Sequence, residues 1–267
     1  DGDIINCTIV GNDAIGNGGG ISGSAAAITN TILWDNTDGN SATNIEEEQI
    51  WNCQEANISF SCIQDDIPMD DNVYVWGTDI IDVDPRFVDI VSRDYHLQDR
   101  SLCIDAGDLS SPYSNEPGNN GERINLGAYG NTSEATSTID TDGDGLGDSF
   151  EIRAGLNHLS VDTDGDGLVD GSGGVVSIAD YPDGHDDGTG HVKGELDLGT
   201  SASDADSDND GFSDLAEFIR VTNPLDHSVS PVNSTLNVPS AEYATVQKAI
   251  DAAIDGDTIV VSAGTYN

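Results

Sequence analysis

The chain has 267 residues, and its 8 Lys and Arg against 50 Asp and Glu give a formal net charge of −42 at pH 7. Nucleic acids and anionic lipids bind positive surfaces, so we expect neither a nucleic acid partner nor docking on anionic lipid. No stretch approaches the roughly 18 to 20 apolar residues of a membrane span. Low hydrophobicity with high net charge is also typical of disorder, so the pattern of the acids decides between a folded and an unfolded chain.

The texture of the sequence changes twice and predicts three domains. Residues 1–133 hold 23 acids and 4 bases, residues 134–232 hold 23 acids and 3 bases, and residues 233–267 hold 4 acids and 1 base. The acids of the middle domain are regularly spaced, which argues against a disordered acidic tail.

The first domain contains an internal repeat. Ile5–Asn12 is similar to Thr29–Asn36, and a third, looser copy covers residues 56–63. Asn12 and Asn36 are 24 residues apart, and short β-branched runs at a period in the low twenties are typical of a solenoid of short strands. We expect Asn at the recurring turns to bond to the next coil and to adopt left-handed backbone.

These coils are followed by stretches at 84–89, 94–97, 101–108 and 123–130. Together, residues 1–131 resemble the C-terminal end of right-handed parallel β-helices of the pectate-lyase-like superfamily in bacterial secreted surface proteins. The resemblance implies an all-β fold, a right-handed parallel β-helix. Lyases of this superfamily use calcium and a basic residue, yet the first 85 residues contain no Lys or Arg. We therefore expect no enzymatic activity, with a polysaccharide-binding or polysaccharide-lyase-like protein as the alternative.

All the cysteines lie in the first domain: Cys7, Cys53, Cys62 and Cys103. They form no CxxC pair, which disfavours a zinc site. Their even number fits an extracellular protein with up to two disulfides, and buried free thiols are an equal alternative. The sequence does not choose among the three pairings.

The middle domain contains calcium loops of the form D-x-D-x-D-G-x-x-D-x-x-E. Such a loop supplies oxygen ligands at positions 1, 3, 5, 7, 9 and 12, the seventh through its backbone carbonyl, and turns sharply at Gly in position 6. Two loops fill every ligand position: Asp140, Asp142, Asp144, Leu146, Asp148 and Glu151 in the first, and Asp206, Asp208, Asp210, Phe212, Asp214 and Glu217 in the other.

Between them lies an incomplete loop with Asp162, Asp164, Asp166, Leu168 and Asp170. Its position 12 is Gly173, and we predict that Glu195 completes it after the excursion 171–193. About three Ca²⁺ ions are expected in all. His185 and His191 lie in the excursion, where an exposed polar loop or a degenerate fourth loop is a simpler reading than a transition-metal site.

The sequences that follow the loops distinguish the kind of calcium module. EF-hands need a helix on each side, and the flanks before these loops are Ser/Thr-rich or acidic. Glu151 is followed by Ala154–Asn157, and Glu217 by Val221–Pro224. In this spacing, residues 138–228 resemble the thrombospondin type-3-like calcium-binding repeats of bacterial surface proteins.

The third domain predicts a helix and a strand. Val246, Ile250 and Ile254 are four residues apart and would share a helix face, Gly256 would end the helix, and 258–262 would be a strand. This arrangement resembles the N-terminal cap helix and first strand of a pectate-lyase-like β-helix. We expect either a fragment of a longer protein or a repeat unit of a head-to-tail assembly.

The sequence therefore predicts a non-enzymatic, calcium-stabilised structural or adhesive protein, extracellular or at the cell surface. The β-helices would act as rods and the calcium loops as joints. Its partner would be a second copy of the chain, bound head-to-tail through the β-helix ends in a filament, with a polysaccharide as the alternative partner.

Overall fold

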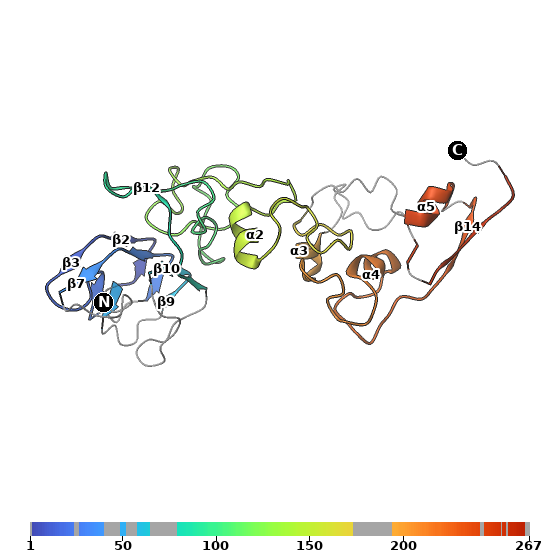
Figure 1. Ribbon diagram of the computed structural model, residues 1–267, viewed down its shortest axis with the longest axis horizontal. Helices are drawn as coiled ribbons and strands as arrows, with labels where there is room; N and C mark the ends of the chain where they lie inside the picture. Colours follow the sequence, from blue (N-terminus) through green and yellow to red (C-terminus); the bar gives the residue numbers. More distant parts are fainter. Residues whose placement is uncertain are drawn as a thin grey trace. The chain divides into compact units, whose positions relative to one another are not determined.

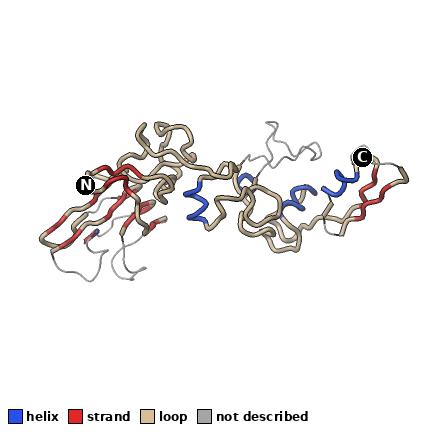
Figure 2. Tube along the Cα trace, turned by 45° about the horizontal axis from the view of Figure 1, so that its top comes forward, coloured by secondary structure: helices blue, strands red, loops and turns tan. Residues whose placement is uncertain are grey.

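The computed structural model describes residues 2–23, 27–39, 49–51, 58–64, 79–172, 194–240, 243–251, 253–254 and 256–264. The chain divides into two compact units, residues 1–139 with 147–154, and residues 140–146 with 155–267. Regular structure consists mostly of short strands, with a few short helices (Figures 1 and 2). Among the described helices, none is long and apolar enough to cross a membrane.

The N-terminal unit begins with two successive sets of short parallel strands. The first set is β1 (Ile4–Ile5), β2 (Thr8–Val10), β3 (Asp13–Ala14) and β4 (Ile21–Ser22). The second set is β5 (Ile28–Thr29), β6 (Ile32–Trp34), β7 (Thr37–Asp38) and β8 (Ile50–Trp51). Each strand of the first set pairs in parallel with its counterpart in the second.

The register of these pairs follows the period seen in the sequence. Ile4 faces Ile28 and Thr8 faces Ile32, both at a separation of 24 residues. The pairing continues through β9 (Ile58–Ser59), β10 (Ser61–Ile63) and β11 (Ile80–Ile81). These parallel sheets are compatible with a β-helix.

Apolar side chains from successive strands pack together inside the strand sets. This buried cluster contains Ile21, Ile28, Leu33, Ile50, Ile58 and Ile63. Each full burial of such a side chain contributes roughly 1.5–3 kcal/mol, so the stacked aliphatic side chains are a main source of the unit's stability.

Asparagines occupy the recurring turns as expected. Asn6 and Asn30 both have left-handed backbone, with φ of 50° and 53°. Asn12 donates from Nδ2 to Oδ1 of Asn36 at 2.8 Å, which links one repeat to the next. The third copy places Phe60 in the same left-handed turn, with φ of 46°, where a bulky residue is strained.

The closing region begins with a hairpin and continues as a turn-rich segment. β12 (Phe87–Asp89) pairs antiparallel with β13 (Asp94–Leu97). Farther along, the Gly127 amide donates to the Asn30 carbonyl at 2.8 Å, and the Asp108 amide donates to Asn30 Oδ1 at 2.8 Å. The buried Asn30 therefore fastens the closing region to the strand sets.

Three of the cysteines are free thiols in the structure. Cys62 and Cys103 are buried in one apolar cluster, and burial raises the pKa of the Cys62 thiol, with the neighbouring Cys103 adding to the shift. Cys7 is partly buried, and Cys53 lies outside the described residues.

The helix α2 (Asp148–Ala154) belongs to the N-terminal unit and is tied to its closing region. The guanidinium of Arg153 donates to the carbonyl oxygens of Leu102, Ile104 and Asp105 at 2.7 to 2.8 Å. One arginine thus satisfies three carbonyls of a segment that has no regular secondary structure to satisfy them.

The second unit contains α3 (Glu195–Leu198), α4 (Asp214–Arg220), β14 (Thr235–Val238), α5 (Val246–Asp251) and β15 (Thr258–Val261). β14 pairs in parallel with β15, and α5 lies against them (Figure 1). Arg220, at the end of α4, forms an ion pair with Asp257, just before β15.

The predicted helix and strand near the C-terminus are present, but the predicted apolar face is wrong. Val246 and Ala249 pack on β14, whereas Ile250 is 51% exposed. The helix ends at Asp251, so the buried Ile254 lies beyond it. Spacings of three and seven residues from Val246, rather than four and eight, therefore face the sheet.

Candidate metal centres

The three acidic loops share one backbone conformation. The glycine at position 6 is left-handed in each, with φ of 97° at Gly145, 105° at Gly167 and 99° at Gly211, as the motif requires. The amide of this glycine donates to the position-1 carboxylate in every loop, at distances of 2.9 to 3.2 Å. The first carboxylate therefore helps to fix the tight turn.

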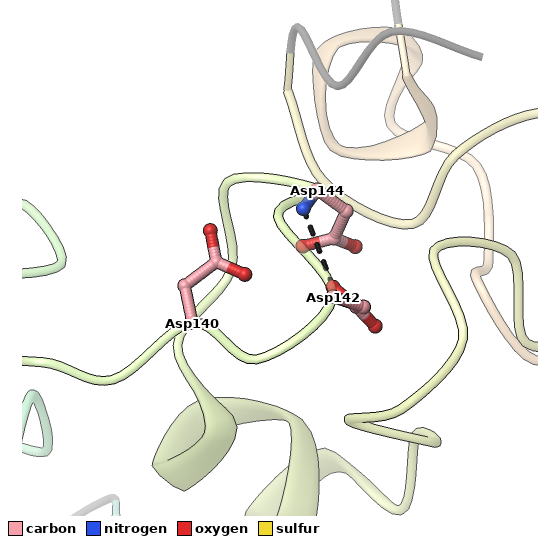
Figure 3. Close-up of side chains that lie close together, drawn as sticks. All are labelled: Asp140, Asp142 and Asp144. Carbon is pink, nitrogen blue, oxygen red and sulfur yellow. Dashed lines mark hydrogen bonds between the residues drawn. The ribbon is translucent and has the colours of Figure 1, made fainter.

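The carboxylates at positions 1, 3 and 5 converge in all three loops. Each group offers ligand oxygens that lie within 4.8 Å of one another: Asp140, Asp142 and Asp144; Asp162, Asp164 and Asp166; Asp206, Asp208 and Asp210. Figure 3 shows the first group, in which the Asp144 amide donates to Asp142 Oδ1 at 3.3 Å. Oxygens bound to one Ca²⁺ at about 2.3–2.6 Å can be at most about 5 Å apart, so this spacing suits a single ion.

The predicted ligands of the first loop are divided between the two units. Asp140, Asp142, Asp144 and Leu146 belong to the second unit, whereas Asp148 and Glu151 lie on α2 in the first. Asp148 and Glu151 are fully buried, and Asp148 forms an ion pair with Arg100 at 3.1 Å.

Glu195 occupies the place in the second loop that Glu217 occupies in the third. The Glu217 amide donates to the carbonyl of Ser213, at position 8, at 3.0 Å, and the Glu195 amide donates to the carbonyl of Val169, also at position 8, at 2.8 Å. Both glutamates are fully buried. The structure thus brings Glu195 to the loop that lacks its last acid.

The chain returns to the second loop at the point where it left. A Cβ atom on Gly194 would lie 1.7 Å from the carbonyl oxygen of Gly171, so only glycine permits this approach. The segment between these glycines can therefore be inserted without disturbing the loop. Residues 173–193, including His185 and His191, lie outside the described residues.

Several buried carboxylate oxygens have no hydrogen-bond partner among the described residues. In the third loop they belong to Asp208, Asp210 and Glu217, and in the second loop to Asp164 and Glu195. A buried polar oxygen without a partner is costly, and a cation held among the oxygens would remove that cost. The donor set, hard carboxylate oxygens alone, suits Ca²⁺.

The charges of the neighbouring acids raise the pKa of the closing glutamates. Burial, followed by the charges of Asp164, Asp166 and other loop acids, raises the pKa of Glu195 to about 8. Burial, followed by the charges of Asp210, Asp208 and Asp214, raises the pKa of Glu217 to about 7. Without a cation, these carboxyls are therefore partly protonated near neutral pH.

The acids at position 9 are engaged by position 2. Thr163 donates to Asp170 from both its amide and its hydroxyl, at 2.7 and 2.6 Å. Ser207 does the same to Asp214, at 3.0 and 2.7 Å. These carboxylates hold their loops closed, which suits the position-9 role of reaching an ion through water.

Sequence reasoning overlooked the hydroxyl residues that support the acids. Besides position 2, a threonine follows the closing glutamate by five residues in both loops of the second unit. Thr200 Oγ1 donates to Glu195 at 3.4 Å, and Thr222 Oγ1 donates to Glu217 at 3.2 Å. The repeated Ser or Thr at these two positions is the signal that could have identified them.

Comparison with known proteins supports this assignment. The family model of the bacterial TSP3 repeat matches residues 140–155 and 206–226, which are the first and third loops with the residues after them. TSP3 repeats bind calcium and are typical of extracellular proteins. No curated protein and no solved structure matches the chain.

Proposed function

We propose that this protein is a non-enzymatic, extracellular or cell-surface structural protein whose middle region binds about three Ca²⁺ ions. The observation that carries the proposal is the convergence of three carboxylates in each loop, together with buried oxygens that lack a hydrogen-bond partner among the described residues. The ions would be held by the residues at positions 1, 3, 5, 7 and 12, with position 9 acting through water.

The bound ions would neutralise the loops and fix the short helices that follow them. In the second unit, α4 begins at the third loop and ends at Arg220, which pairs with Asp257 beside β15. An ion that orders α4 therefore also orders the attachment of the β14–β15 module. This is how calcium would stiffen a joint between β-structured segments.

The finer reading of the N-terminal unit, a right-handed parallel β-helix of the pectate-lyase-like kind that serves as a rod, is part of this proposal. It rests on the parallel pairing at 24-residue spacing and on the buried aliphatic stack. The arginines of the closing region have structural contacts that favour a structural role. Arg123 donates to the carbonyls of Gly107 and Ala106, and Arg100 pairs with Asp148.

Head-to-tail association with a second copy, as in an adhesive fibre or filament, is the proposed use of the rod. Apolar residues are exposed on the outer strands of both units, with Ile5 52% exposed on β1 and Val260 43% exposed on β15. Sedimentation should detect concentration-dependent oligomers that a Val260→Lys change abolishes. Strict monomers at all concentrations would contradict the association.

The calcium proposal is tested by melting the protein with and without the ion. In excess EGTA, hydrogen exchange over residues 138–228 should rise at a lower temperature than exchange over the strands of residues 4–63. Saturation at a hundred times the dissociation constant should stabilise each site by about 2.7 kcal/mol. An identical melting temperature in excess EGTA and in millimolar CaCl₂ would overturn the proposal.

A further inference from the structure

The carboxylate at position 5 of one loop reaches into the next loop. Asp166 Oδ1 accepts from the Leu168 amide of its own loop at 2.7 Å, and Asp166 Oδ2 accepts from the Leu215 amide at 2.8 Å. Leu215 is position 10 of the third loop. Asp166 is thus a predicted ligand of one ion and a hydrogen-bond acceptor from the neighbouring loop.

The same hydrogen bond occurs one loop earlier. Asp144 Oδ1 accepts from the Leu146 amide at 2.7 Å, and Asp144 Oδ2 accepts from the Gly171 amide, position 10 of the second loop, at 3.1 Å. In the last loop, Asp210 Oδ1 accepts from the Phe212 amide, and its Oδ2 has no hydrogen-bond partner among the described residues. The contact therefore recurs wherever another loop follows.

The bond from Leu215 acts on the ligand at position 12 of the third loop. Leu215 lies in the first turn of α4, where amides have no acceptor within the helix. Asp166 satisfies that amide and holds the start of α4, and Glu217 follows two residues later. The backbones are also close, because a Cβ on Gly167 would lie 2.7 Å from the Leu215 side chain.

We propose that Asp166 is a positioning residue for the third calcium site as well as a ligand of the second. An ion in the second loop fixes the Asp166 carboxylate, the carboxylate fixes the Leu215 amide, and α4 then presents Glu217 to the third ion. Binding at the two loops is consequently coupled, and each ion raises the affinity for the other. The inference rests on the proposed function.

The test measures the affinity of the third loop alone. A Phe212→Trp change at position 7, which contributes only its backbone carbonyl, places an indole beside that loop, so sensitised Tb³⁺ luminescence reports its occupancy and Ca²⁺ competition gives its affinity. Asp164→Ala then disables the second loop. In this reporter chain we expect Asp164→Ala to lower the third-loop affinity at least about fivefold, the lower end of typical coupling.

The hydrogen bond is removed by Leu215→Pro, and Leu215→Ala is the matched control that loses the same side chain but keeps the amide. We expect Asp164→Ala to lower third-loop affinity in the Leu215→Ala background and to leave it unchanged in the Leu215→Pro background. An amide-to-ester replacement at position 215 removes only the N–H. It decides the matter if proline abolishes binding at the third loop.

Two results would overturn the proposal: equal effects of Asp164→Ala in the Ala, Pro and ester backgrounds, or no effect of Asp164→Ala in the reporter chain. Failure of the reporter chain to bind Tb³⁺ or Ca²⁺ at all would instead refute the proposed function. The two failures are therefore distinguishable.

Discussion

The amide of Glu195 donates a 2.8 Å hydrogen bond to the carbonyl oxygen of Val169, although a long insertion separates the two residues in the sequence. The bond reproduces the link between positions 12 and 8 of the third loop. It converts an apparently incomplete motif into a loop with the same set of acids as its neighbours.

Glu195→Gln should therefore remove the second site while the other sites persist. Loss of a residue that only supports a metal ligand already costs about 10- to 100-fold in affinity, so loss of the ligand charge should cost at least about 100-fold. Calorimetric titration should find one strong site fewer. Asp197→Asn on the same helix is the control, because Asp197 is exposed. Equal stoichiometry in the two variants would contradict the assignment.

The spacing of acids and glycines predicted the loops because calcium ligation is local in sequence. The position-6 glycine needs left-handed backbone, and that need is visible in one residue type. The partner of the second loop is not local, and only the spatial approach of Gly194 to Gly171 shows how the chain returns. Sequence alone could suggest Glu195 but could not place it.

The strand pairing was predictable to a similar extent. The repeated Asn12 and Asn36 gave the 24-residue register, which the structure has in β2 and β6. Two-residue strands such as β3 and β4 carry no periodic signal. The choice of the buried face of α5 depended on the sheet beside it: Ala249, a small residue, faces that sheet, and Ile250 does not.

Calcium binding should release protons near neutral pH. Glu195 has a pKa raised to about 8 by burial and by neighbouring acids, so at pH 7 it is about nine-tenths protonated without the ion. The ion needs the ionised form, so affinity at the second loop should fall as pH drops through 8, and at the third loop as pH drops through the Glu217 pKa of about 7. Titration at pH 7 in two buffers of different ionisation enthalpy measures the released protons.

Glu195→Gln is the control for this release and should lower it by about one proton for each chain. In the calcium-free protein the sign is opposite. The folded pKa is raised, so the contribution of Glu195 to stability is greatest below its unfolded pKa and is lost as pH rises through 8. Identical binding enthalpies in both buffers would show that no proton is released.

The acids at positions 3 and 9 of the third loop should differ in their effect on calcium affinity. Asp208 Oδ2 is buried and has no hydrogen-bond partner among the described residues, whereas both Asp214 oxygens accept from Ser207. Asp208→Asn should thus lower affinity more than about 100-fold, and Asp214→Asn by about 10- to 100-fold as a supporting residue.

Both changes remove one charge from the same loop, so each controls for the electrostatic effect of the other. The Phe212→Trp reporter measures both affinities. A larger loss from Asp214→Asn than from Asp208→Asn would mean that position 9 binds the ion directly.

The buried amide network between the strand sets should be worth several kcal/mol. Asn36 is 1% exposed, donates to the Ile9 carbonyl and to Gln49 Oε1 at 2.9 and 2.7 Å, and accepts from Asn12. Asn36→Ala leaves the fully buried Gln49 side chain and the Ile9 carbonyl without these bonds, at about 1–3 kcal/mol for each buried group left unpaired.

Asn12→Ala removes the other end of the same hydrogen bond, and Asn12 is exposed, so water replaces its side chain. This variant should lose less than about 1 kcal/mol, because an exposed donor is not left unsatisfied. Urea unfolding in saturating calcium, which holds the calcium loops constant, measures both variants. Equal midpoints for Asn36→Ala and Asn12→Ala would mean that the network is open to water and that the strand sets are held by their aliphatic stack alone.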